Sequence, residues 1–178
     1  MNDDALRNLI RTIPDYPKPG ILFRDITTLL KDGDGWGEVV DRLVTRYGRS
    51  GIAAVAGIEA RGFIVGGAVA AGLGAGFIPI RKRGKLPAAI ESLDYQLEYG
   101  SDRVEVHRDA VDAGQRVLLV DDLIATGGTA VAARDLLRGL GAVVVEAAFV
   151  IELPALSGRV RLEATGTPVH SLLAFDGH

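Results

Sequence analysis

The chain has 178 residues, 48% of them hydrophobic, and a formal net charge of −3 at pH 7. This length predicts one domain, residues 1–178, with a substantial core, and the acidic balance argues against a nucleic-acid-binding surface. The absence of cysteine excludes disulfides and thiolate metal sites and favours a reducing, cytoplasmic location. The N-terminus lacks the apolar segment of a signal peptide, and five glycines and a proline interrupt the most apolar region, residues 63–80, so we expect no membrane span.

The N-terminal segment is predicted to contain a short helix and a proline-rich loop. Apolar residues at helical spacing predict a helix over Ala5–Thr12 that Pro14 ends. Three prolines then predict an extended loop over Ile13–Gly20. The Phe23 that follows is interpreted either as a core residue beside a local Arg24–Asp25 ion pair, or as an aromatic wall of a base pocket.

The first strand of the predicted sheet leads into a charged turn. An amphipathic helix over Trp36–Tyr47 precedes an apolar run, Ile52–Ile58, that is typical of a buried parallel strand. Glu59, Ala60 and Arg61 follow, and a helix is expected to begin near Phe63. Arg61 is therefore placed to meet an anion at the carboxyl end of a strand, although an ion pair with Glu59 is the alternative.

A basic segment follows the next strand. Gly76–Ile80 is predicted as that strand, and four of the five residues in 81–85 are basic. Such a cluster is usually a solvated surface patch, but between two strands it is also suited to close over a polyphosphate as a lid, so that residues 81–100 form a lid loop and strand. Alternation over Tyr95–Tyr99 and the apolar run Val104–Val106 predict two further strands.

The strongest local signal runs from Val117 to Ala130. Four apolar residues, Val117–Val120, predict a buried strand, and Asp121 and Asp122 close it. The small-residue turn 125–129 then leads into a predicted helix ending at Leu140. A glycine- and threonine-rich turn at a strand-to-helix junction leaves backbone N–H groups free to bind a phosphate, and carboxylates beside it accept hydrogen bonds from sugar hydroxyls. The alternative is an ordinary turn in which Asp122 only caps the helix.

The remaining elements complete an α/β pattern. Strands are predicted over Ala142–Leu153 and Val169–Phe175, with a loop over Leu162–Gly166 between them. The alternation of strands and helices predicts a mostly parallel, twisted sheet with helices on both faces. Residues 1–35 fall outside this pattern, and we expect them to cover the site as a hood.

Several common site motifs are missing. The sequence contains no G-x-G-x-x-G opening a helix, no G-x-x-x-x-G-K-[ST], no G-x-S-x-G and no H-E-x-x-H. His107, His170 and His178 have no metal-ligand spacing, so we interpret them as structural or exposed. The chemistry is therefore expected at the acidic strand end and its phosphate turn.

Five segments in order, PDYPKPGILFRDIT, EARGF, RKRGKLP, LEYG and VDDLIATGGT, resemble the adenine phosphoribosyltransferases of the type I phosphoribosyltransferase family. The resemblance covers residues 13–140, and the ending LLAFDGH is similar to bacterial members. It implies transfer of a phosphoribosyl group from phosphoribosyl pyrophosphate to adenine with Mg²⁺, giving AMP and pyrophosphate through an oxocarbenium-like transition state. It also implies a homodimer and a cis peptide bond between Glu59 and Ala60.

The resemblance assigns a role to each part of the site. The residues that it implies are Ala125, Thr126, Gly127, Gly128 and Thr129 for the ribose phosphate; Asp121 and Asp122 for the ribose hydroxyls; Leu22, Phe23, Arg24 and Leu123 for adenine; Glu59, Ala60, Arg61, Arg81, Lys82 and Lys85 for pyrophosphate; and Glu98 for the imidazole side of the base. Glu98, Arg61, Asp121 and Asp122 are the expected catalytic residues. Mg²⁺ is expected to bind mainly through pyrophosphate, with Asp121 or Asp122 as a candidate ligand.

Some alternatives stay open at this stage. Glu98 either assists proton transfer at the base or pairs with Arg83 in the lid. Ala89-Ile90-Glu91 replaces a lid segment that is usually more polar, and residues 82–91 are expected to be mobile until an anion offsets their charge. A phosphoribosyltransferase for another purine and a non-catalytic nucleotide-binding regulator on the same fold are the competing functions.

Overall fold

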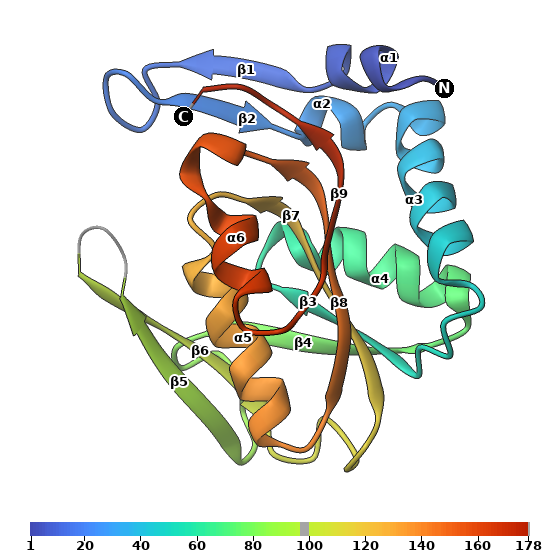
Figure 1. Cartoon of the computed structure of the whole chain (residues 1–178), viewed down its shortest axis with the longest axis vertical. Coiled ribbons are helices and arrows are strands. Elements are labelled where there is room, and N and C mark those ends of the chain that lie inside the picture. The colour runs from blue at the N-terminus through green and yellow to red at the C-terminus, as the bar shows by residue number, and fades with distance from the viewer. Residues whose placement is uncertain (97–99, 178) are drawn as a thin grey trace.

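The computed structural model describes residues 1–96 and 100–177 (Figure 1). Its main sheet consists of β3 (Ala54–Ile58), β4 (Gly76–Lys82), β5 (Ile90–Gln96), β6 (Ser101–His107), β7 (Arg116–Ile124), β8 (Val143–Glu152) and β9 (Val169–Ala174). The strand order is β5-β6-β4-β3-β7-β8-β9. Strands β4, β3, β7, β8 and β9 pair in parallel, and the antiparallel β5–β6 hairpin extends the sheet beyond β4.

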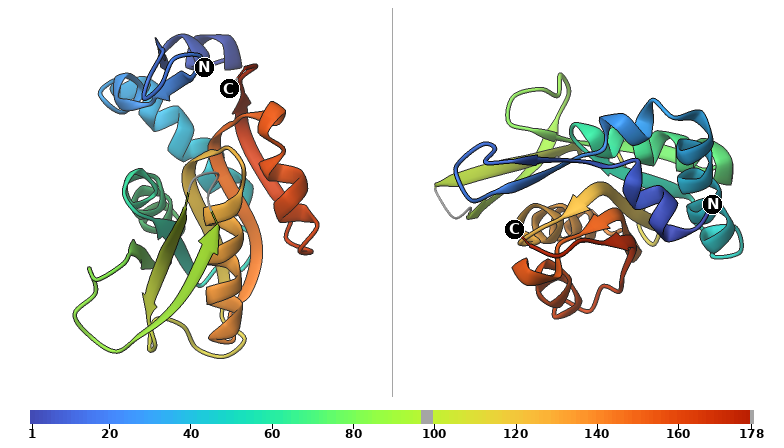
Figure 2. Two further views of the ribbon diagram at one scale, coloured as in Figure 1. Left: turned by 90° about the vertical axis from the view of Figure 1, so that its left-hand side faces the viewer. Right: turned by 90° about the horizontal axis from the view of Figure 1, so that it is seen from above.

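Helices cover both faces of this sheet. The helices α3 (Gly33–Tyr47) and α4 (Arg61–Leu73) lie on one face, while α5 (Gly128–Gly139) and α6 (Gly158–Glu163) lie on the other (Figure 2). Alternate residues of β7 face the two layers: Leu118 packs on the α3–α4 side and Leu119 on the α5–α6 side. The predicted fold class is thus confirmed. Among the described residues, no helix is both long and apolar enough to span a membrane.

The N-terminal segment lies above the end of the sheet where β7 and β8 finish (Figure 1). It contains α1 (Asp3–Asn8), β1 (Arg11–Pro14), β2 (Leu22–Asp25) and α2 (Thr27–Leu30), and β1 and β2 form a separate antiparallel pair. The helix predicted over residues 5–12 was wrong at both ends. Asn2 caps α1 by accepting a hydrogen bond from the Ala5 N–H at 2.9 Å, whereas pairing with β2 draws Arg11–Pro14 into a strand.

Three further boundaries differ from the sequence prediction. Strand β7 continues through both aspartates to Ile124, because Asp121 and Ile124 pair in register with Phe149 and Glu152 of β8. Strand β4 likewise includes the first two basic residues of the 81–85 segment, which pair with β6. The loop predicted over residues 162–166 begins only after Glu163, because helix α6 runs to that residue, and a 3₁₀ turn, η1 (Pro154–Leu156), precedes the helix.

Candidate active site

A short turn joins β7 to α5. Residues 125–129 form this turn, and a cavity of about 120 Å³ lies against them. Gly127 has φ +77°, a left-handed conformation that favours glycine, and it occupies the N-cap position of α5 with no side-chain cap. The first N–H groups of the helix are therefore free to bind an anion. The Thr129 hydroxyl lies in the same turn and donates to the Tyr95 hydroxyl at 3.0 Å.

A second cavity, of about 340 Å³, lies between β2 and the end of β7. Its lining residues come from four segments: Ile21, Leu22, Phe23, Arg24, Arg61, Leu123, Ala125, Thr126, Leu153 and Leu156. All four residues predicted for the base, Leu22, Phe23, Arg24 and Leu123, line it. The Phe23 ring packs edge-on against Tyr16, with ring centroids 5.2 Å apart.

Sequence reasoning missed part of this cavity. Leu153 and Leu156 follow the end of β8. Leu153 was predicted to lie in a strand, and Leu156 was assigned no role. The alternative of a local Arg24–Asp25 ion pair was wrong, because Asp25 pairs with Arg11. Arg24 instead donates to the carbonyl of Asp176 at 2.7 Å, which ties the C-terminal segment to β2.

The two cavities are adjacent. Leu123, Ala125 and Thr126 line both of them. We call the second cavity the base cavity and the 125–129 turn the phosphate loop, after the groups predicted to bind there. A group that spans the shared wall reaches the base cavity at one end and the phosphate loop at the other.

The two aspartates lie beside this junction and differ in environment. The Arg61 Nε donates to Oδ2 of Asp122, which is only 5% exposed. The predicted alternative of an Arg61–Glu59 ion pair was therefore wrong. Desolvation by burial, together with the neighbouring Asp122 carboxylate, raises the pKa of Asp121 well above its ordinary value. One carboxyl group is thus paired with a cation while its neighbour is held toward its neutral form.

Glu59 forms ion pairs with two of the basic residues that were predicted to bind pyrophosphate, Arg81 and Lys85. It accepts hydrogen bonds from Arg81 Nε at 3.2 Å and from the Lys82 backbone N–H at 3.0 Å, and it forms an ion pair with Lys85. Burial alone opposes its ionisation, but these hydrogen bonds lower the pKa of Glu59 to about 2. The peptide bond between Glu59 and Ala60 is cis, as expected.

Lys82 has a different environment from its neighbours. Its Nζ donates to the Tyr95 hydroxyl at 2.6 Å and forms an ion pair with Asp102. The same Tyr95 hydroxyl accepts the hydrogen bond from Thr129. The side chain of Lys82 therefore joins β4, the β5–β6 hairpin and the phosphate loop.

Comparison with known proteins agrees with this geometry. Residues 30–167 match the family model described as a phosphoribosyl transferase domain. An adenine phosphoribosyltransferase of Bradyrhizobium sp. (strain ORS 278) is 62% identical over 176 residues, which is 99% of this chain and 98% of that protein. The chain belongs to the adenine phosphoribosyltransferases.

Solved structures of this family superpose closely. Adenine phosphoribosyltransferase from Rhodothermus marinus is 48% identical, with a TM-score of 0.91 and 97% of each chain covered. The enzyme from Saccharomyces cerevisiae, complexed with an imino-altritol bisphosphate and adenine, is 38% identical, with a TM-score of 0.90 and coverage of 96% of this chain and 98% of its own.

Three further predictions for this adenine phosphoribosyltransferase concern Glu98, the metal ligands and His170. Glu98 lies outside the described residues, so its role stays a prediction. Across residues 1–96 and 100–177, no group of three or more histidine or acidic residues is arranged to hold a metal ion. Desolvation by burial lowers the pKa of His170, and it lies on β9, away from the aspartate pair.

Proposed function

We propose that the base cavity receives adenine and that residues 125–129 receive the 5-phosphate of phosphoribosyl pyrophosphate. Transfer of the phosphoribosyl group to adenine, which makes AMP and pyrophosphate, is the reaction of this family and of this chain. The shared lining of the two cavities by Leu123, Ala125 and Thr126 carries the assignment. In AMP a ribose joins the base to the phosphate, so the nucleotide would extend from one cavity into the adjacent one. The adenine bound in the yeast enzyme supports the same use of the base cavity here.

The base is held by an apolar sandwich. Phe23 supplies an aromatic face and Leu123 an aliphatic one, while the backbones of Leu22 and Arg24 read the edge of the ring. Aromatic stacking on a base is worth about 1–3 kcal/mol by alanine substitution. The guanidinium carbon of Arg61 lies 5.8 Å from the centre of the Phe23 ring, so this arginine stands where the base cavity meets the aspartate pair.

The ribose and its phosphate lie between Asp122 and the loop. Asp121 and Asp122 accept hydrogen bonds from the ribose hydroxyls, and the loop N–H groups with the Thr126 and Thr129 hydroxyls donate to the phosphate. Displacement of pyrophosphate builds positive charge at the anomeric carbon and negative charge on the leaving group. Fixed carboxyl groups near the ribose and fixed donors near the phosphates stabilise these opposite charges.

Pyrophosphate binds the side of the site that Glu59 organises. The Glu59–Ala60 backbone, Arg61, Arg81 and Lys85 are its proposed ligands, and Lys82 supports them from the hairpin. Glu59 pairs with Arg81 and Lys85. Pyrophosphate therefore competes with a carboxylate of the protein for the same cations, which favours release of the product.

The family implies Mg²⁺, and the residues present fit one such ion. Mg²⁺ commonly takes one or two carboxylates and completes its shell with phosphate oxygens and water. Asp121 and Asp122 offer adjacent carboxyl groups. Burial and Asp122 raise the pKa of Asp121, and a cation bound beside it would offset this and favour the ionised form. When bound, the ion neutralises charge on the pyrophosphate.

We further propose a cytoplasmic homodimer. The absence of cysteine supports the cytoplasmic location, and the family resemblance supports the homodimer. Exposed Ile64 on α4 and Phe77 on β4 are apolar side chains of the kind that subunit interfaces cover.

The experiment that tests the function mixes the protein with Mg²⁺, phosphoribosyl pyrophosphate and one of adenine, hypoxanthine, guanine or xanthine. Pyrophosphate release is measured for each base. We expect release with adenine and at least about tenfold less with the other three, equivalent to about 1.4 kcal/mol. Equal release with a second purine would overturn the base assignment, and no release with any base would overturn the reaction.

A further inference from the structure

The start of helix α6 presses directly on the phosphate loop. A Cβ atom built on Gly158 would lie 2.2 Å from the carbonyl oxygen of Ala125 and 2.9 Å from the Gly127 nitrogen. In the reverse direction, a Cβ on Gly127 would lie 2.8 Å from the carbonyl oxygen of Gly158. Backbone therefore contacts backbone with no space for a side chain. The position of the loop depends on where α6 begins.

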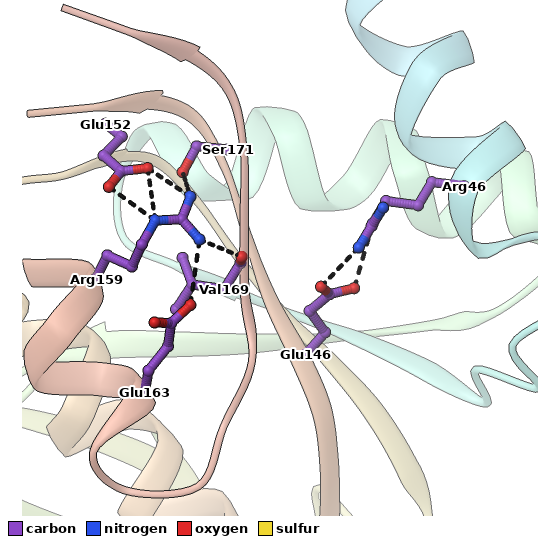
Figure 3. Close-up of polar contacts among 7 residues, drawn as sticks. All are labelled: Arg46, Glu146, Glu152, Arg159, Glu163, Val169 and Ser171. Carbon is purple, nitrogen blue, oxygen red and sulfur yellow. Dashed lines mark hydrogen bonds and ion pairs between the residues drawn. The ribbon is translucent and has the colours of Figure 1, made fainter. Parts of the chain in front are cut away.

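Helix α6 has six residues, too few to be stable without tertiary contacts. The preceding Ser157 has φ +58° and provides no side-chain cap. Arg159, in the first turn, anchors the helix instead. Its Nε donates to Oε1 of Glu152 at 2.8 Å, and its Nη2 donates to Ser171 Oγ at 3.2 Å (Figure 3). Its Nη1 donates to the carbonyl of Val169.

These contacts reach both C-terminal strands. Glu152 is the last residue of β8 and is 8% exposed, while Val169 and Ser171 belong to β9. Hydrogen bonds from Arg159 lower the pKa of Glu152, so this pair is fully charged at neutral pH. A charge-assisted fork of this kind fixes both the distance and the angle between its partners. Through it, the edge of the sheet sets the position of α6.

We propose that Arg159 and Glu152 are positioning residues that hold the phosphate loop in its anion-binding geometry through the backbone of Gly158. The inference rests on the proposed function, in which residues 125–129 bind the 5-phosphate. Neither Arg159 nor Glu152 lines either cavity. The backbone of Glu152 pairs with Ile124 just before the loop, whereas its side chain reaches the loop through Arg159 and α6.

Strand β8 carries a matched control. Glu146, on the same strand, accepts two hydrogen bonds from Arg46 of α3, at 2.8 Å and 3.3 Å (Figure 3). This pair has a similar fork geometry but joins β8 to α3, and neither residue contacts the loop. Glu152→Gln and Glu146→Gln therefore each remove one charge from an arginine fork on one strand. The two variants differ in that only the Glu152 pair holds α6.

The experiment compares both variants of the full chain with the wild type in binding AMP, ribose 5-phosphate and adenine, and in steady-state kinetics. For Glu152→Gln we expect the Kd of AMP and of ribose 5-phosphate, and the KM of phosphoribosyl pyrophosphate, to rise about tenfold, equivalent to about 1.4 kcal/mol. The KM of adenine and kcat at saturating substrates should stay within about twofold. Glu146→Gln should leave all of these values within about twofold.

The contrary results are distinct. Equal phosphate affinities in the two variants would overturn the inference, as would a parallel loss of adenine affinity, which would indicate loosening of the whole site. If Glu152→Gln does not fold, Gly158→Ala applies the same test by pushing on the Ala125 carbonyl, and wild-type AMP affinity in that variant would overturn the inference. Failure of the wild type itself to bind AMP would instead refute the proposed function.

Discussion

Replacing Gly127 by alanine tests whether the loop geometry binds the phosphate. Two costs are expected. A β-carbon at φ +77° costs about 1–2 kcal/mol. The new atom would also lie 2.8 Å from the Gly158 carbonyl oxygen and 3.0 Å from its Cα, and such overpacking typically costs about 1–3 kcal/mol more. Both costs together are small enough for a folded domain to survive.

Gly114 offers a control that separates the two costs. It has φ +79°, and a Cβ built there meets nothing within 4 Å. Gly114→Ala therefore carries the conformational cost alone, and we expect its melting temperature to fall by roughly 2–8 °C. The melting temperature of Gly127→Ala should fall further than that of Gly114→Ala, because only the methyl group at position 127 displaces a neighbouring backbone.

The decisive measurement is AMP binding by calorimetry, with adenine binding measured alongside. We expect the Kd of AMP to rise at least about tenfold in Gly127→Ala, equivalent to about 1.4 kcal/mol, and to stay within about twofold in Gly114→Ala. Adenine affinity should change little in either variant. An unchanged Kd for AMP in Gly127→Ala, or an equal rise in both variants, would refute the assignment of the loop as the phosphate site.

Three further predictions concern single side chains. Phe23→Ala should raise the KM of adenine roughly 5- to 150-fold, the equivalent of about 1–3 kcal/mol of lost stacking, and an unchanged value in initial-rate assays would remove Phe23 from the base site. The folded-state pKa of Glu59, about 2 against an ordinary 4.5, contributes stability that is present above about pH 4.5 and lost as the pH falls toward 2; Glu59→Gln should flatten this part of the urea-unfolding profile, and parallel profiles would contradict the pairing. The raised pKa of Asp121 has the opposite sign, since its ionisation opposes folding at neutral pH; Asp121→Asn should raise the melting temperature at pH 7 by at least about 2 °C while lowering kcat, and a lower melting temperature would count against an unfavourable desolvated carboxylate.

The central strands were predictable because burial on both faces leaves a continuous apolar run. Val117–Val120 is entirely apolar and residues 142–153 are apolar except for Glu146 and Glu152, and both proved to be neighbouring strands. The edges of the fold carry weaker signals. Strand β1 is mostly exposed and exists because β2 pairs with it, and α6 is held by Arg159 rather than by its own propensity. No local sequence pattern predicts the pairing of β1 with β2 or the contacts that Arg159 makes with β8 and β9.

The turn at residues 125–129 and the β2 wall of the base cavity were more predictable, since each is a short stretch of chain. Residues 125–129 form one turn, and Leu22, Phe23 and Arg24 are consecutive in β2. Leu153, Leu156 and Gly158 reach the same site only through the end of β8 and the turn that follows it. Their contribution depends on how the sheet is assembled, which spacing along the chain does not reveal.

Charge pairing was the least predictable feature, and it changes how the basic segment works. The expected mobility of residues 82–91 assumed that clustered positive charges repel one another until an anion arrives. Arg81 and Lys85 pair with Glu59, however, and Lys82 pairs with Asp102. Repulsion therefore does not hold the segment open. Under the proposed assignment, a bound pyrophosphate competes with Glu59 for two cations, so we expect its affinity to depend on exchange between carboxylate and phosphate partners rather than on unopposed charge.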